Sequence, residues 1–227
     1  MRPLLNACFG PAKAAQFQLV CTECNSVSDL PGKQSVSIVD ALFYADAFGM
    51  MLHSEFKAMT WFCARGGTQM WWNNPPTLYG WRHYGDYGML ATHDPNNPTF
   101  TPPGGDEDTP YPTYFALKLI TQFAHPGDAV IAASSDNPLL TVYACRRPGH
   151  LTLLLVNKSQ NSDADATCSL SGVQVTGVGR TLEYGKVQDF AQEHGAAVDL
   201  VEGSAVVTGH TVEVNVPAYT VAVIDVP

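Results

Sequence analysis

The chain has 227 residues, of which 45% are hydrophobic and 15% charged, and this composition excludes an intrinsically disordered protein. A formal net charge of −9 argues against nucleic acid or an anionic membrane as the partner. No run of about 18 apolar residues is present, so no membrane-spanning helix is expected. The first residues lack the apolar stretch and cleavage site of a signal peptide, so we expect a cytoplasmic protein or a piece of a larger one.

The first part of the chain alternates between predicted helices and strands. A helix over 2–15 precedes a short apolar strand over 17–22, and a long helix over 34–53 precedes a second apolar strand over 56–64. Strand, helix and strand in this order predict a right-handed crossover and parallel pairing. This part therefore has the pattern of an α/β fold.

Residues 65–109 form a loop that is too long for an ordinary connection, and such loops commonly carry function. A helix over 110–125 follows it. Two interpretations are open for the aromatic side chains of the loop: they stack on sugar rings, or they fill a seam between the two halves of the chain. Arg82 and His83 are candidates for binding sugar hydroxyls. The aromatic residues concerned are Trp71, Trp72, Trp81, Tyr84 and Tyr87.

After residue 125 the period changes from helical to alternating. Short strands separated by Gly, Pro, Asn and Asp predict an antiparallel β-sandwich of seven or more strands. The predicted boundary near 124–128 divides the chain into an α/β part, 1–125, and an all-β part, 126–227.

The sequence CTEC at 21–24 ends the first predicted strand and has several readings. A redox pair needs its first thiolate at a helix N-terminus, and a zinc site needs a second pair of ligands at short spacing, neither of which the sequence provides. We therefore expect Cys21 and Cys24 to be packing thiols, and nothing indicates a metal or an organic cofactor. The other four cysteines are also scattered through the chain in the manner of free thiols: Cys8, Cys63, Cys145 and Cys168.

Glu23 lies between these cysteines, directly after an apolar strand. A buried, unpaired carboxylate would cost several kcal/mol there. At the carboxyl end of a strand in a (β/α)₈ barrel it would instead point into the open mouth, where catalytic groups collect. The remaining alternative is a carboxylate that caps the following loop.

The order LVCTECNS, helix, AMTWFCARGG, aromatic loop, YFALKLI and LTLLLVNKS resembles the C-terminal part of a clan-A glycoside hydrolase. Within that clan it most resembles the families of α-L-arabinofuranosidases and related endoglucanases and xylanases, which join a barrel to a β-sandwich. The resemblance implies the last two or so β/α units of a (β/α)₈ barrel followed by an antiparallel sandwich, with a carbohydrate substrate. It implies that Glu23 is the nucleophile of a retaining reaction, Trp61 the floor of the sugar site and Asn25 an orienting group. Trp72, Trp81, Tyr84 and Arg82 are the further substrate-binding candidates.

A retaining glycosidase also needs a second carboxyl group as acid and base, about 5 Å from the first. The family places it after an Asn, and no Asn-Glu pair occurs in this sequence. Glu55 would sit at the wrong end of the barrel. Four acidic residues of the long loop remain candidates to approach the mouth: Asp86, Asp94, Glu107 and Asp108.

Two parallel strands do not close a barrel, and their free edges favour association. We therefore expect a homo-oligomer or a complementing barrel chain. Two other functions stay open. A non-catalytic carbohydrate-binding or interaction module would need surface aromatics on the sandwich, where the sequence offers Tyr143, Tyr184, Phe190 and Tyr219. An ester hydrolase would need an atypical site, since no G-x-S-x-G elbow is present.

Overall fold

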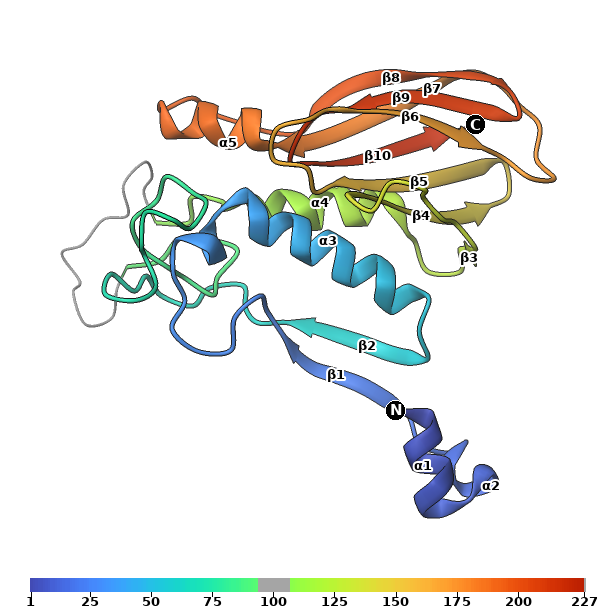
Figure 1. The fold of residues 1–227 in the computed structure, drawn as a ribbon, viewed down its shortest axis with the longest axis horizontal. Coiled ribbons are helices and arrows are strands. Elements are labelled where there is room, and N and C mark those ends of the chain that lie inside the picture. The colour runs from blue at the N-terminus through green and yellow to red at the C-terminus, as the bar shows by residue number, and fades with distance from the viewer. Residues whose placement is uncertain (94–106, 227) are drawn as a thin grey trace.

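The computed structural model describes residues 1–93 and 107–226. In the first part of the chain, a parallel pair of strands is joined through a helix, as the sequence predicts (Figure 1). The elements are α1 (Arg2–Phe9), α2 (Pro11–Ala14), β1 (Leu19–Cys24), the 3-10 helix η1 (Lys33–Val36), α3 (Ile38–Leu52), β2 (Phe56–Trp61) and α4 (Pro112–Phe123).

Two local signals fix the ends of the main helices. The Ser37 hydroxyl caps α3 by accepting a hydrogen bond from the Val39 N–H at 3.3 Å, and Pro112 occupies the first turn of α4. The predicted helix over 34–53 therefore begins later than expected, because residues 33–36 form a separate 3-10 turn.

The second part of the chain forms a single eight-stranded sheet with the order β3-β4-β5-β10-β7-β8-β9-β6, in which every pairing is antiparallel. The strand over 201–209 and the helix α5 were not expected from the sequence. The elements are β3 (Ala129–Ile131), β4 (Leu140–Arg147), β5 (His150–Asn157), β6 (Ala164–Ser169), β7 (Val175–Gly185), α5 (Lys186–Glu193), β8 (Val201–Gly209), β9 (Thr211–Val216) and β10 (Thr220–Val226).

The large sheet curls over itself, so that its strands lie in two layers (Figure 1). A core of apolar side chains from β4, β5, β7, β8, β9 and β10 fills the space between the layers, with Leu155, Val212 and Ile224 fully buried. The outcome is sandwich-like, but hydrogen bonds connect all eight strands into one continuous sheet.

Helices α3 and α4 separate the two sheets. Their apolar faces share a second core with the outer face of the large sheet, where Leu119, Phe123 and Leu154 are buried. Met59 and Trp61 of β2 pack against the same core from the other side. The small β1–β2 sheet therefore has one face covered by helix, and within the described residues β1 and β2 pair only with each other.

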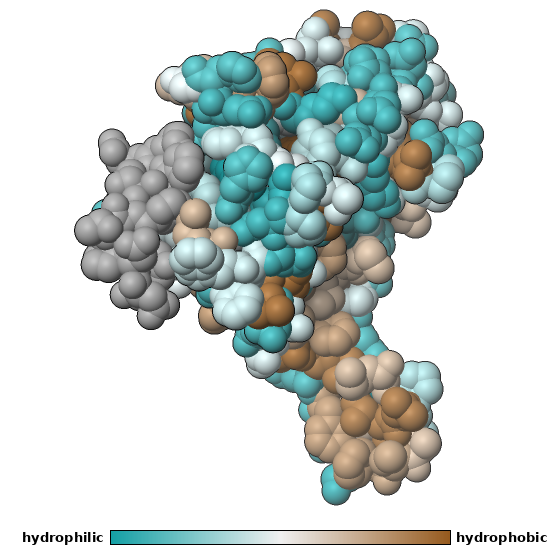
Figure 2. All heavy atoms as spheres, turned by 60° about the vertical axis from the view of Figure 1, so that its left-hand side comes forward, coloured by the Kyte–Doolittle hydropathy of each residue, from teal (hydrophilic) through white to brown (hydrophobic). Residues whose placement is uncertain are grey.

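The N-terminal segment projects away from the rest of the molecule (Figure 1). No residue of α1 is buried, and the Arg2 guanidinium holds this segment to Glu55 by an ion pair of 2.5 Å. Apolar side chains gather on the surface of this projection (Figure 2), among them Leu4, Phe9 and Phe17. Within the residues described, we find no helix with the length and apolarity that crossing a membrane requires.

Candidate active site

Glu23 lies at the carboxyl end of β1 with its side chain exposed. Because β1 and β2 run parallel, the loops that follow both strands begin at the same edge of the sheet. The first of these loops contains Asn25, and the second begins at Phe62. Glu23 therefore lies at the carboxyl end of the sheet, where residues from the two loops converge.

An irregularity in β1 determines which way Glu23 faces. Cys21 pairs with Met59 and Cys24 with Trp61, so that two residues of β1 oppose a single residue of β2. Such a β-bulge places Cys21 and Cys24 on the same side of the sheet, toward α3. Glu23 is turned to the side away from α3, which we call the open face. The open face presents the exposed side chains of Val20, Thr22, Glu23, Ala58 and Thr60.

Phe62 and Tyr87 lie next to Glu23. The Phe62 side chain is 42% exposed, and its ring meets the ring of Tyr87 edge-on with centroids 5.6 Å apart. The pKa of Tyr87 is raised by burial and by the negative charges of Asp29 and Glu23. The Tyr87 hydroxyl therefore lies within the electrostatic reach of the Glu23 carboxylate.

Asn25 ties the two strand ends together. Its side-chain amide donates hydrogen bonds to the carbonyl oxygens of Phe62 and Tyr87, and its oxygen accepts a bond of 2.7 Å from the Ser26 N–H. These contacts fit the predicted orienting role. Asn25 thus positions the neighbouring loops, and its part in substrate binding stays a prediction.

Trp61 does not face Glu23. Its ring packs on Tyr44 with centroids 4.2 Å apart and on Phe43 at 6.2 Å, both on α3. The predicted role as the sugar floor is contradicted, because Trp61 points toward the helix. Phe62, the next residue along the chain, is the aromatic side chain on the Glu23 side. The sequence WF held both candidates, and only the register of the strand distinguishes them.

Arg82 and Trp81 lie in the seam between the two parts of the chain. Arg82 is 3% exposed and forms an ion pair of 2.8 Å with Asp189 of α5, besides a bond of 2.9 Å to Gln192. The Trp81 ring stacks on the Arg82 guanidinium at 4.0 Å and donates to Asp189 at 3.3 Å. Tyr84 is 1% exposed. This burial contradicts sugar binding by Arg82 and Tyr84 and favours the seam reading, also for Trp81.

Trp71 and Trp72 are exposed, as a sugar-stacking role requires. They belong to the loop that follows β2, and the next residues of that loop lie against the loop that follows β1. There the Asn74 side-chain oxygen accepts a bond of 2.8 Å from the Lys33 N–H. Substrate binding by Trp72 stays a prediction. His83 is also exposed.

The predicted acid and base candidates do not gather around Glu23. Asp86 is fully buried, and its carboxylate accepts a bond of 2.7 Å from the Gly88 N–H. Burial raises the pKa of Asp86 to about 6, against the lowering effect of four loop amides. Asp86 thus organises the long loop. Glu55 precedes β2 and pairs with Arg2, while Asp108 pairs with Arg65 at 2.5 Å on the surface. Glu107 is exposed and Asp94 lies outside the described residues.

A buried acid that the sequence gave no sign of lies behind the site. Asp40, in the first turn of α3, is 2% exposed, and burial raises its pKa to about 8, while a hydrogen bond with Ser26 lowers it. An acidic residue in a first helical turn ordinarily faces solvent near the positive end of the helix dipole. Only the packing of α3 beneath the loop after β1 shows that this one is enclosed.

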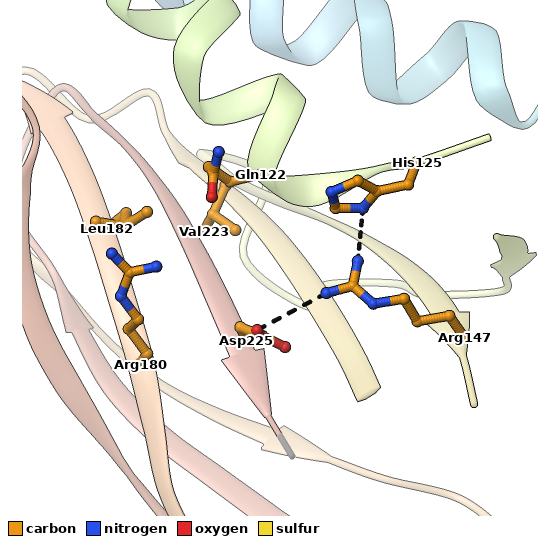
Figure 3. Close-up of a pocket in the computed structure, with 7 residues that line it drawn as sticks. All are labelled: Gln122, His125, Arg147, Arg180, Leu182, Val223 and Asp225. Carbon is orange, nitrogen blue, oxygen red and sulfur yellow. Dashed lines mark hydrogen bonds and ion pairs between the residues drawn. The ribbon is translucent and has the colours of Figure 1, made fainter. Parts of the chain in front are cut away.

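A small polar pocket lies on the large sheet, below the end of α4 (Figure 3). The Arg147 guanidinium donates to the His125 ring at 2.5 Å and lies 3.9 Å from the Asp225 carboxylate. Arg180, on the neighbouring strand, pairs with Glu202 at 2.8 Å. The charged side chains of this pocket therefore already have partners within the protein, and the helix layer separates the pocket from Glu23.

The other predicted functions find little support in the geometry. Of the four sandwich aromatics, Tyr143 and Tyr184 are buried, and the ring of Tyr219 packs on Tyr79 with centroids 5.0 Å apart. Phe190 alone of the four is exposed, so these residues do not form an aromatic platform. Among the described residues, no three His, Cys, Asp or Glu side chains gather as a metal site would require.

Comparisons with known proteins add to this geometry. No protein-family model matches the sequence, and no curated protein does. Solved structures do match. A GH30 endoxylanase from Clostridium papyrosolvens C71 is 14% identical with a TM-score of 0.57, and the match covers 95% of this chain and 43% of that one. The chain shares its fold with part of a glycoside hydrolase.

Two further structures support the same conclusion. A GH51 arabinofuranosidase from Xanthomonas axonopodis pv. citri is 17% identical with a TM-score of 0.60, over 99% of this chain and 43% of its own. A family 44 xyloglucanase from Paenibacillus polymyxa is 15% identical with a TM-score of 0.57, over 99% of this chain and 35% of its own. The chain thus spans less than half the length of these proteins. The predicted resemblance to clan-A glycoside hydrolases is confirmed for the fold.

Proposed function

We propose that this chain supplies the nucleophile, Glu23, of a retaining glycoside hydrolase. The observation that supports this most is the position of Glu23: an exposed carboxylate at the carboxyl end of a parallel strand, turned away from the covering helix. Catalytic groups of β/α barrels lie at this end of the strands. Phe62 beside it offers an aromatic face of the kind on which the C–H face of a sugar packs.

In the proposed reaction, a Glu23 oxygen attacks the anomeric carbon as the bond to the leaving oxygen breaks. A second carboxyl group, about 5 Å away, protonates that oxygen and then removes a proton from the water that releases the sugar. Tyr87 is suited to hold the Glu23 carboxylate, because its hydroxyl lies within reach of that charge.

The second carboxyl group is proposed to come from outside the described part of this chain. Within that part, Asp86 is enclosed by loop amides, and Glu55 and Asp108 are paired elsewhere. In the described part of the chain, the outer edges of β1 and β2 have no further strand beside them, so further strands can pair there, and the open face can pack against another surface. We propose that a second copy of the chain or a complementing barrel chain covers them in the working enzyme.

The structural neighbours suggest the substrate class. They include an endoxylanase, an arabinofuranosidase and a xyloglucanase. We therefore propose a xylan, an arabinofuranoside or a β-glucan as the substrate.

The test is covalent trapping with 2-deoxy-2-fluoro glycosides of xylose, arabinose and glucose that carry activated leaving groups. Such leaving groups depart without an acid, so Glu23 can react even where the second carboxyl group is missing. We expect a mass gain of one fluorosugar on the tryptic peptide 14–33, in which Glu23 is the only glutamate.

Glu23→Gln removes the nucleophile and should abolish the adduct, because an amide does not attack the anomeric carbon. Glu55→Gln is the matched control, since Glu55 lies on the separate tryptic peptide 34–57 and should leave labelling unchanged. An adduct that persists in Glu23→Gln, or no adduct from any of the sugars, would contradict the proposal.

A further inference from the structure

The bulge in β1 also brings two thiols to one side of the sheet. In a regular strand, residues three apart point to opposite faces, because side chains alternate. Here Cys21 and Cys24 both pair with residues of β2 that face α3, so both thiols point the same way. Glu23 stands between them in the chain and points the other way.

The two thiols are neighbours on this side of the sheet. The Cys21 Sγ donates a hydrogen bond of 3.2 Å to the backbone carbonyl of Glu23. Burial and the neighbouring Cys21 raise the pKa of the Cys24 thiol. Both side chains are half-buried, so a small reagent has access to them.

We infer that Cys21 and Cys24 are a reversible dithiol site whose oxidation to a disulfide displaces Glu23. The effect on catalysis rests on the proposed function, whereas the disulfide does not. A disulfide requires Cα atoms about 4.4–6.8 Å apart. Residues three apart in an extended strand lie about 10 Å from each other, and a bulge shortens this span only in part. Closing the bond therefore contracts the end of β1 and moves the backbone that carries Glu23.

The chemistry is thiol–disulfide exchange with a small-molecule disulfide such as glutathione disulfide. The Cys21 thiolate attacks one sulfur of the oxidant and releases one glutathione, which leaves a mixed disulfide on Cys21. The Cys24 thiolate then attacks the Cys21 sulfur and releases the second glutathione. Two protons leave the protein thiols, and the two electrons reduce the oxidant to two thiols.

The contact with the Glu23 backbone is the link between the thiols and the carboxylate. In the reduced form, the Cys21 thiol donates to the Glu23 carbonyl. In the disulfide, this sulfur has no hydrogen and the bond is lost. The end of β1 thus loses the hydrogen bond from Cys21 to the Glu23 carbonyl and gains a covalent bond between Cys21 and Cys24. Both changes act on the backbone of Glu23, the proposed nucleophile.

The experiment equilibrates the full chain in glutathione and glutathione disulfide, quenches it with acid, alkylates free thiols and digests it with trypsin. Cys21 and Cys24 are the cysteines of peptide 14–33. In the wild type we expect this peptide to lose both alkyl groups and to weigh two hydrogens less than the dithiol. In Cys24→Ser we expect glutathione to remain attached to Cys21, because the second step has no thiol.

Cys63→Ser is the matched control, since Cys63 is also half-buried and lies in the loop after β2. It should form the disulfide in peptide 14–33 as the wild type does. A peptide 14–33 that stays fully alkylated, or that carries glutathione on each cysteine in the wild type, would overturn the inference.

A second measurement follows the rate at which a fluoroglycoside labels Glu23. Oxidation should slow labelling at least tenfold in the wild type, reversibly with dithiothreitol, and should leave the rate unchanged in the double variant Cys21→Ser, Cys24→Ser, which has no thiol at either position. A disulfide that forms without slowing the labelling would overturn the control of Glu23. A disulfide in a chain that no sugar labels even when reduced would count against the proposed function alone.

Discussion

The two sheets of this protein differ in how they are covered. The part of the large sheet beneath the helices is closed on both sides, with the helices on one face and the sheet's own curled strands on the other, and β5 is buried along nearly its whole length. The small sheet has α3 on one face and nothing on the other in the described part of the chain. The closed region carries the structural contacts, and the open region carries the groups that can meet a substrate.

The difference also appears in the charges. Buried charges of the closed region are matched, as in the pair of Arg82 and Asp189, because an unpaired charge there would be costly. Glu23, on the open face, forms neither an ion pair nor a side-chain hydrogen bond that we find in the described residues. An exposed carboxylate without such a partner keeps both oxygens free for chemistry.

Removal of Arg82 should produce the largest effect on stability. Arg82→Met leaves the Asp189 carboxylate buried without its partner and leaves the Val36 carbonyl without its donor. Breaking a buried ion pair on one side costs about 3–5 kcal/mol. Urea unfolding followed by tryptophan fluorescence measures this loss.

The control for this prediction is Arg65→Met. Arg65 belongs to the same long loop, but its ion pair with Asp108 is more than half exposed on both sides. Exposed pairs contribute about 0–1 kcal/mol. Equal losses from the two substitutions would show that the seam is not the closed region we describe.

Removal of Asp40, the buried acid behind Glu23, should stabilise the folded protein, whereas removal of Arg82 should destabilise it. The unfolded chain ionises an aspartate near about 3.9, whereas the pKa of Asp40 in the folded protein is about 8. The contribution of this group to stability is full below the lower value and is lost as the pH rises toward the higher one. Asp40→Asn cannot ionise, so it should be more stable than the wild type at pH 8, by a few kcal/mol.

Thermal unfolding at several pH values between 4 and 8 measures this difference. At pH 4 the variant and the wild type should melt alike, and their melting temperatures should separate as the pH rises. Asp29→Asn, an exposed aspartate on the loop after β1, is the control and should melt in parallel with the wild type. A variant that is less stable at pH 8 would show that Asp40 is ionised and paired in the folded protein.

The sequence predicted the closed and open regions to different degrees. Apolar runs and helical periods located β1, α3, β2 and α4, since these signals are local. The helix α5 and the strand β8 were missed. Residues 186–193 have a polar pattern, and this helix is held by long-range contacts from Asp189 and Gln192 to Arg82. Contacts between residues more than 100 positions apart produce no local sequence pattern from which a helix can be predicted.

The same limit explains the errors at the candidate site. The sequence placed Glu23 at the end of a strand, but whether Trp61 or Phe62 shares its face depends on the register between β1 and β2. A one-residue shift turns every side chain to the other face. The bulge between Cys21 and Cys24 is such a shift, and neither strand signals it alone. Arg82 looked like a hydroxyl ligand only because its buried partner lies on α5.

The smallest effect on the isolated chain is expected on the open face. Val20 is 45% exposed, and no other segment of the described chain covers β1 at this position. Val20→Lys should therefore change the stability of the monomer by no more than about 0.5 kcal/mol. If further strands cover this face, the same substitution buries an ammonium group without a partner and should weaken association at least tenfold.

Sedimentation velocity over a concentration series, together with thermal unfolding, separates these two effects. Val178→Lys is the matched control, because Val178 is an exposed valine on β7 of the closed region and should alter neither measurement. A large loss of monomer stability in Val20→Lys would mean that the face is already packed within one chain. Unchanged self-association in Val20→Lys would exclude a second copy on this face, and a wild type that is monomeric throughout would leave the complementing barrel chain as its proposed cover. The open face is thus tested by Val20→Lys, which should leave the stability of the single chain unchanged and weaken its association.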